Sequence, residues 1–390
     1  MEDLWFNDRS EFTRWVAKAG LLRESFVVVD VGVQGGAHPR WKLLGDYLIF
    51  HGFDAIAEAV AEVQQANAGR ANYHFHNFAL GDEDGERTFY VNVLNPTSSS
   101  IFVQGPSRFA NERSDEARVV QLRRLDTLFE DGLLPRADFL KVDVEGYEKF
   151  VFSGAKNLLS SALGVEAESN FNISPIYPKS HFTALSDSFV EQGLILADIG
   201  FNRVPRTTFL QALQVAGLAD RGMDELGRPA TVNLLFCRDP IDEADRPQNY
   251  ASQPRSLNVD QIIKTMMIYE LFGLNDIALD IGERFSQTLG SRIDVSQAMH
   301  LLAKADCRRV TASPAVFVQT AADVPTLRQE VSALREQLSD ALRRMIMAEQ
   351  EMDAIRRSNS WRLTAPLRKA KELARQARAR VRAVRGNEKR

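Results

Sequence analysis

The chain has 390 residues, 44% of them hydrophobic, and a formal net charge of −4. This length exceeds that of most single domains and predicts two or more units. The two cysteines, Cys237 and Cys307, lie far apart without metal-ligand spacing, which argues against a disulfide framework or a structural zinc site. The acidic amino terminus and the lack of a long apolar stretch favour a cytosolic protein.

The first predicted elements are a short helix and a buried strand. Residues 10–19 have helical spacing, with Ser10 as the candidate N-cap. The run from Phe26 to Val29 is continuously apolar and rich in valine, as expected of a strand covered on both faces in a parallel sheet. A glycine-rich turn follows this strand and reads DxGxxG, with Asp30, Gly32, Gly35 and Gly36.

The composition of this turn indicates the kind of ligand. A dinucleotide fingerprint has glycine where this chain has Asp30, and a carboxylate there disfavours a pyrophosphate. S-adenosylmethionine carries an ammonium and a sulfonium but no phosphate, so it fits Asp30, Gly32, Gly35 and Gly36 better than a nicotinamide cofactor does. The alternative is a glycine turn that binds no ligand.

Two further polar residues are candidates for the same site. Residues 41–49 have helical spacing, and residues 52–60 are predicted to be the second strand, with Glu58 at its end as the ribose-binding acid. A third strand is predicted over residues 73–78, and Asn77 at its end is placed where the adenine would lie. A solvated helix-start glutamate and a turn-capping asparagine are the alternatives.

A second motif places acids at the end of a later strand. Residues 139–144 are predicted to form that strand, and Asp143, Glu145 and Glu148 follow within a few positions. Acids so close together are costly unless they meet a proton, a cation or water, although helix-start carboxylates are the alternative. We expect Asp143 to be the catalytic base or a metal-coordinating group, with Glu145 supporting it. A divalent cation that bridges Asp143 and Glu168 is a second possibility.

These motifs resemble a known family. VDVGVQGG, the Glu58 segment, NFALGDEDG, LDTL and LKVDVEGYE are, in this order, similar to the FkbM family of S-adenosylmethionine-dependent methyltransferases over roughly residues 20–240. The resemblance implies an α/β fold with the seven-stranded, Rossmann-like sheet of class I methyltransferases. It also implies O-methylation of a sugar hydroxyl in a bacterial surface polysaccharide or of a natural product. One departure from the family is that its Glu-Pro at the end of the second strand is replaced by Glu58-Ala59. The rival function is a catalytically inactive scaffold of a glycan-assembly complex.

The rest of the chain is predicted to be helical. We expect a methyltransferase domain over residues 1–242, a helical module over 257–306, a coiled coil over 325–357 and a basic helical tail over 358–390. The coiled-coil prediction rests on apolar residues that alternate steps of four and three. These residues are Leu327, Val331, Leu334, Leu338, Ala341, Met345, Ala348, Met352 and Ile355. A helix that packs on its own domain is the alternative.

The tail is strongly basic while the body is acidic. Residues 356–390 hold 13 lysines and arginines against 2 acids, which leaves a net charge of −15 on residues 1–355. The phrase SNSWRLTAPLR resembles tails of bacterial surface-glycan enzymes. We expect a homo-oligomer through the coiled coil, a sugar or glycan acceptor, and a cytoplasmic protein that contacts the anionic inner face of the plasma membrane through this tail. Disorder of the tail and nucleic-acid binding are the alternatives, although no aromatic residue follows Trp361 to support base stacking, so nucleic acid is not the expected partner.

Overall fold

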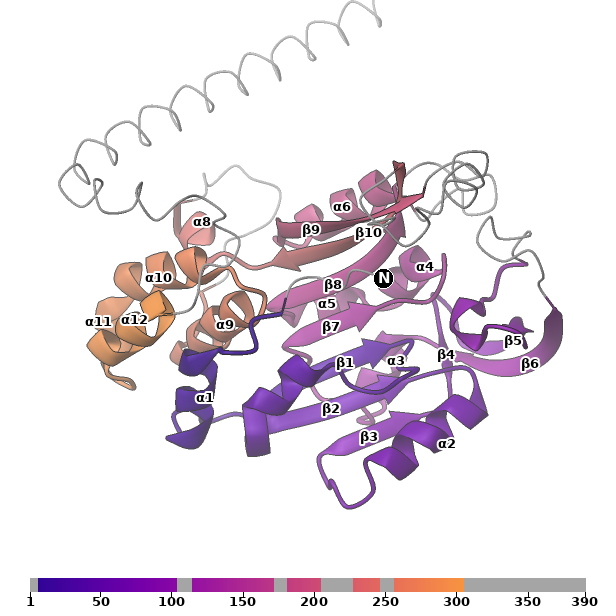
Figure 1. Cartoon of the computed structure of the whole chain (residues 1–390), viewed down its shortest axis with the longest axis horizontal. Helices are drawn as coiled ribbons and strands as arrows, with labels where there is room; N and C mark the ends of the chain where they lie inside the picture. Colours follow the sequence, from indigo (N-terminus) through magenta and orange to yellow (C-terminus); the bar gives the residue numbers. More distant parts are fainter. Residues whose placement is uncertain (1–5, 104–113, 172–180, 205–226, 246–255, 305–390) are drawn as a thin grey trace, which may run out of the picture. The chain divides into compact units, whose positions relative to one another are not determined.

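The computed structural model of the chain describes residues 6–103, 114–171, 181–204, 227–245 and 256–304 (Figure 1). All of them belong to one compact unit, Met1–Cys307. The predicted coiled coil and basic tail lie outside the described residues. Among the described helices, none is both long and apolar enough to cross a membrane.

The centre of the unit is a seven-stranded sheet with the order β3-β2-β1-β7-β8-β10-β9. Strands β3, β2, β1, β7 and β8 are parallel, and β10 is antiparallel to both of its neighbours. The predicted mixed α/β fold with a seven-stranded sheet is therefore confirmed. The strands are β1 Phe26–Val31, β2 Leu48–Phe53, β3 Tyr73–His76, β7 Phe139–Val142, β8 Gly164–Asn170, β9 Ile195–Val204 and β10 Arg228–Cys237.

One face of the sheet is covered by short helices and carries an apolar core. Val29, Val31, Leu140, Val142 and Val165 point to this face and are buried together. The helices of this part of the chain are α3 Leu125–Glu130, α4 Glu148–Ser153, α5 Lys156–Ser161 and α6 Phe182–Glu191. A second, three-stranded sheet is formed by β4 Ala79–Leu80, β5 Gly85–Asn92 and β6 Asp115–Arg123, with the 3-10 turn η2 Pro96–Ser98 after β5.

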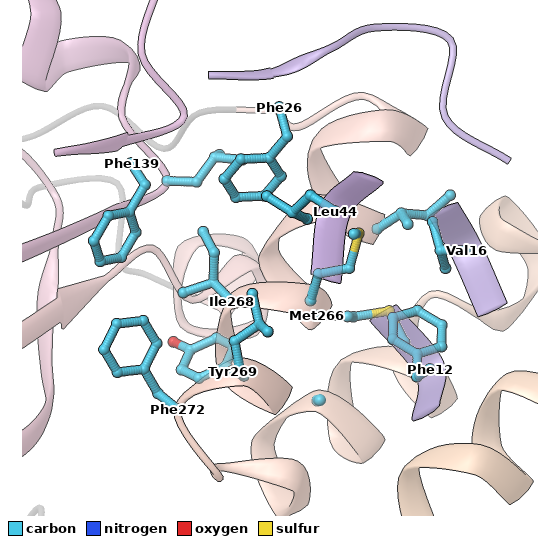
Figure 2. Close-up of a cluster of buried hydrophobic side chains, with 14 of the residues drawn as sticks. Phe12, Val16, Phe26, Leu44, Phe139, Met266, Ile268, Tyr269 and Phe272 are labelled. Atoms are coloured by element: carbon cyan, nitrogen blue, oxygen red, sulfur yellow. The ribbon is translucent and has the colours of Figure 1, made fainter. Parts of the chain in front are cut away.

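The opposite face is covered by elements from both ends of the unit. Phe26 and Phe139 of the sheet pack in one cluster with Phe12 of α1 and with Met266 and Ile268 of α9 (Figure 2). Helix α9, the first helix of the predicted helical module, is buried on nearly all sides. The elements are α1 Glu11–Lys18, η1 Pro39–Tyr47, α8 Pro240–Asp245, α9 Val259–Leu271, α10 Asn275–Arg284, α11 Ser286–Leu289 and α12 Val295–Lys304.

The second strand begins and ends earlier than the sequence pattern predicted. The 3-10 helix η1 is kinked at Gly45, where φ is +56°, so the chain enters β2 at Leu48. The apolar residues beyond Asp54 belong to helix α2, Ala57–Ala66, rather than to a strand. The Asp54 carboxylate accepts a hydrogen bond of 2.8 Å from the backbone N–H of Ile56, immediately before this helix. The polar residue at the end of β2 is therefore Asp54.

A buried carboxylate joins α9 to the amino-terminal helix. Glu270 accepts hydrogen bonds from the backbone N–H groups of Phe12 and Thr13, at 2.9 and 2.7 Å. These groups belong to the first turn of α1, so Glu270 does the capping that was predicted for Ser10, whose hydroxyl instead donates to the carbonyl of Asn7. The contact spans most of the sequence length of the unit and fixes one end of its core.

We expect Glu270→Ala to lower the free energy of unfolding by about 2–3 kcal/mol, because two buried N–H donors lose a charged acceptor. Urea unfolding monitored by circular dichroism would measure this. Glu283→Ala, on the exposed face of α10, is the matched control and should change stability by less than about 0.5 kcal/mol. Equal effects of the two substitutions would show that Glu270 does not hold α1 in place.

Candidate active site

A cavity of about 370 Å³ lies at the carboxyl ends of β1, β2 and β7. The strand order reverses between β1 and β7, and such a reversal is where open α/β sheets bind their ligands. The cavity has the volume of a small-molecule site. Its lining combines polar residues with an apolar group formed by Phe53, Ile56, Phe78 and Phe89.

The glycine-rich turn after β1 forms one wall of the cavity. Gly32 has φ of +87°, and a Cβ atom built on it would lie 1.9 Å from the carbonyl oxygen of Asp143. The turn therefore touches the exit of β7 and cannot carry a side chain at this position. Gly35 has φ of +85°, and a Cβ there would meet no atom within 4 Å, so the backbone faces open space that a ligand can occupy.

Asp30 lies at the base of the cavity beside a lysine that no sequence motif singled out. The register of β1 and β7 pairs Asp30 with Lys141, and Lys141 Nζ lies 3.5 Å from Asp30 Oδ1. Burial raises the pKa of Asp30 to about 6, although the Lys141 ammonium opposes this shift. Burial alone would lower the pKa of Lys141, but the charges of Asp30, Asp143 and Glu166 outweigh it and raise that pKa.

Three acids meet at the rim of the cavity. The carboxylates of Asp143, Glu145 and Glu168 have oxygen atoms that all lie within 4.8 Å of one another. Burial and the charges of Asp143 and Glu145 raise the pKa of Glu168 well above its usual value, and Glu168 is hydrogen-bonded to Asp143. Lys141 Nζ lies 3.7 Å from Asp143 Oδ2. The raised pKa favours the protonated form of Glu168, beside the Asp143 carboxylate.

The turn after β7 carries Asp143 and Glu145, and side-chain hydrogen bonds hold it in a strained conformation. Glu145 has φ of +54°, an unfavourable conformation for a residue other than glycine. The hydroxyl of Ser100, from the polar loop after β5, donates a hydrogen bond of 2.9 Å to the Glu145 carbonyl. The Glu148 carboxylate accepts from the backbone N–H groups of Val144 and Gly146, so it closes the turn instead of facing the cavity.

Two of the predicted cofactor-binding residues lie elsewhere. The Glu58 side chain is 68% exposed on α2 and pairs with Arg118 of β6 at 2.9 Å, outside the cavity lining. Asn77 donates hydrogen bonds to the backbone carbonyls of Asp54 and Ala55, and it is not part of the lining either. The expectation for Glu58 depended on a strand boundary that the structure moves, whereas Asn77 does follow β3 but its amide binds the backbone after β2. Asp54 lines the cavity in place of Glu58, and its position about 20 residues after the glycine turn is the signal that could have identified it.

Comparison with known proteins identifies the domain. Residues 41–188 match the model of the methyltransferase FkbM domain, a range that contains the acidic turn and Asp54. The curated proteins contain no match to the chain. Solved structures that it resembles include the N-methyltransferase NodS from Bradyrhizobium japonicum WM9, at 8% identity and a TM-score of 0.28 over 59% of this chain and 94% of that one.

Another similar structure is Aeropyrum pernix fibrillarin in complex with natively bound S-adenosyl-L-methionine, at 10% identity and a TM-score of 0.29 over 58% of this chain and 76% of that one. Both structural likenesses are remote, and the assignment of the site rests on the family match and on the geometry of the cavity instead. The match covers the strand that supplies Lys141 and the acidic turn after it. Residues 41–188 of the chain are therefore assigned to the methyltransferase FkbM domain.

Proposed function

We propose that this domain methylates a hydroxyl group of a sugar or glycan, with S-adenosylmethionine as the methyl donor. The observation that supports the proposal best is that the cavity of the glycine turn reaches Asp143, whose carboxylate lies beside those of Glu145 and Glu168 and is hydrogen-bonded to Glu168. The glycine turn suits a cofactor, and the acids around Asp143 suit a hydroxyl that must lose a proton. An amine acceptor that arrives neutral also loses a proton, so the identity of the acceptor needs its own test.

The residues of the cavity fit the cofactor. Asp30 supplies negative charge for the cationic amino-acid end, and the open backbone at Gly35 allows close approach. Asp54 is placed to accept hydrogen bonds from ribose hydroxyls, and the apolar side chains of Ile56 and Phe78 suit the adenine ring. When bound, S-adenosylmethionine supplies an electrophilic methyl group on its sulfonium.

The contribution of the chain to the chemistry is to orient the acceptor and to take its proton. An acceptor hydroxyl beside Asp143 donates its hydrogen to this carboxylate, and the oxygen becomes a better nucleophile as the proton leaves. The Lys141 ammonium lies 3.7 Å from the Asp143 carboxylate, and Glu168 is hydrogen-bonded to the same carboxylate, so both side chains hold Asp143 in position. Loop residues Pro96, Thr97 and Ser99 line the cavity and limit the access of water.

A divalent cation held by Asp143, Glu145 and Glu168 is the second way to activate the hydroxyl. The ammonium of Lys141, 3.7 Å from Asp143, would repel such a cation, which favours the proton-transfer route. Activity that persists in EDTA would support proton transfer without a metal. Activity that disappears in EDTA and returns with Mg²⁺ would assign the three acids to a cation.

Calorimetry with S-adenosylmethionine and with S-adenosylhomocysteine tests the proposal first, because an inactive scaffold need not bind either. Methyl transfer from labelled cofactor to glycans extracted from cells with and without the protein tests the acceptor class, with mass spectrometry of the product. If the protein binds the cofactor but no methylated glycan is found, the methyltransferase assignment stands and the sugar acceptor is ruled out. A natural product would then be the favoured acceptor. No cofactor binding by the folded protein would favour the scaffold.

The protonation of Asp30 predicts how cofactor affinity depends on pH. The cationic end of S-adenosylmethionine prefers the ionised carboxylate, and the pKa of Asp30 is about 6. We expect the Kd to rise progressively as the pH falls through this value and to be nearly constant between about pH 7 and 8. Calorimetry from about pH 5 to 8 measures this, and the Asp30→Asn variant should bind at least about tenfold more weakly and almost independently of pH. A wild-type affinity that is flat across this range would contradict a direct role of Asp30.

A further inference from the structure

We propose that the acceptor sugar is held on a polar area of the main sheet beyond the acid cluster, formed by β8, β10 and β9. This inference rests on the proposed function and identifies residues that determine its acceptor specificity. The area consists of Asn170 of β8, Thr231 and Asn233 of β10, and Asn202 of β9. We call it the polar shelf.

The strand register places these side chains on one face of the sheet. Glu168 pairs with Asn233 across β8 and β10, and Asn170 pairs with Thr231. Thr231 pairs in turn with Asn202 across β10 and β9. Residues that are paired across strands lie about 4.5–5.5 Å apart and share a face. The shelf therefore continues directly from Glu168, the partner of Asp143.

The alternation along β10 separates the shelf from the apolar core. Val232 and Leu234 point to the opposite face, where they are buried in the core that also contains residues of α6. Leu235 and Cys237, farther along the shelf's own face, are buried in the core that contains α9. Thr231 and Asn233, which come before them on the same face, are only half-buried. The face thus changes from apolar to polar where it reaches the acid cluster.

The chemistry of the shelf selects a neutral, hydroxyl-rich ligand. Asparagine is disfavoured in strands, yet three neighbouring strands each place one on this face. An amide offers both a donor and an acceptor, and so matches adjacent hydroxyls of a sugar ring without requiring charge. Asn202 Nδ2 donates to Thr231 Oγ1 at 2.9 Å, which orients this amide. A ring hydrogen-bonded to Asn233 presents a neighbouring hydroxyl toward Asp143.

The test measures methyl transfer by the full-length protein to methyl glycosides of glucose, galactose, mannose and rhamnose, with labelled S-adenosylmethionine. The variants are Asn233→Ala and Asn202→Ala. The matched control is Asn67→Ala, because the side-chain amide of Asn67 donates a hydrogen bond to the carbonyl of Val63 at the end of α2, away from the shelf. We expect each shelf variant to lower kcat/KM for the best glycoside at least about tenfold, mainly through KM. The Kd for S-adenosylhomocysteine should stay within about twofold, and Asn67→Ala should behave as wild type.

Deoxy analogues of the best glycoside separate a direct contact from a structural effect. With the wild-type protein, the analogue that lacks the hydroxyl bound by Asn233 should be methylated more slowly than the parent glycoside. With Asn233→Ala, the analogue and the parent glycoside should react at similar rates, because the substitution and the missing hydroxyl remove the same hydrogen bond. If the losses are additive for every analogue, or if KM is unchanged in both shelf variants, the polar shelf does not bind the acceptor. Either result is still compatible with methylation of a sugar. Methyl transfer to amine or phenol acceptors but to none of the glycosides would contradict both the proposed role of the polar shelf and the proposed sugar acceptor.

Discussion

Asp143→Asn is expected to lower kcat at least about a hundredfold while the Kd for S-adenosylmethionine changes by no more than a few-fold. The amide cannot accept the hydroxyl proton, but it keeps nearly the same shape beside Lys141 and Glu168. Single-turnover methyl transfer measures the chemical step, and calorimetry measures cofactor binding. The separation of the two effects distinguishes a role in the chemistry from a role in cofactor binding, because the Asp143 side chain is 31% exposed at the cavity whereas that of Asp30 is only 4% exposed.

Two further variants make this result interpretable. Asp46→Asn changes an exposed acid in η1, and it should leave both kcat and Kd unchanged. Glu168→Gln removes a carboxyl group that is hydrogen-bonded to Asp143 and whose pKa is raised, and it should therefore alter the pH dependence of kcat. Parallel losses of affinity and turnover in Asp143→Asn would indicate instead that this residue supports the glycine turn through its contact with Gly32.

The parts of the site that follow one strand could be predicted from the sequence. The apolar run before Asp30 marks a strand buried on both faces, and the glycines after it require a turn. The strand before Asp143 and the acids after it have the same kind of local signal. These patterns need only the residues themselves and their order, so the strands β1 and β7, the glycine turn and the acidic turn were predicted at the right places.

The parts that depend on contacts between strands were missed. Lys141 became important only because the register sets it opposite Asp30, and no spacing in the sequence records that register. The choice between Glu58 and Asp54 depended on the end of β2, which the kink at Gly45 moves toward the amino terminus. Asn233 appears in the sequence as an ordinary polar residue within an apolar strand until its pairing with Glu168 is known.

Gly32→Ala is expected to lower the free energy of unfolding by more than about 3 kcal/mol and to abolish turnover. A left-handed conformation costs alanine about 1–2 kcal/mol, and the new methyl group would also lie 1.9 Å from the Asp143 carbonyl oxygen. The backbone of the turn cannot retreat, because the N–H of Gly32 donates to the carbonyl of Phe53 at 2.9 Å. Asp143 must therefore move, which displaces the carboxylate that takes the acceptor proton.

Gly69→Ala provides the matched control for this substitution. Gly69 has φ of +89°, nearly equal to that of Gly32, but a Cβ atom there would meet nothing within 4 Å. Its substitution should therefore show only the conformational cost, about 1–2 kcal/mol, and leave turnover unchanged. Urea unfolding and methyl transfer on both variants separate backbone strain from the collision with Asp143. Similar stabilities and similar activities for the two variants would mean that the contact between the glycine turn and the exit of β7 is not as close as the structure places it.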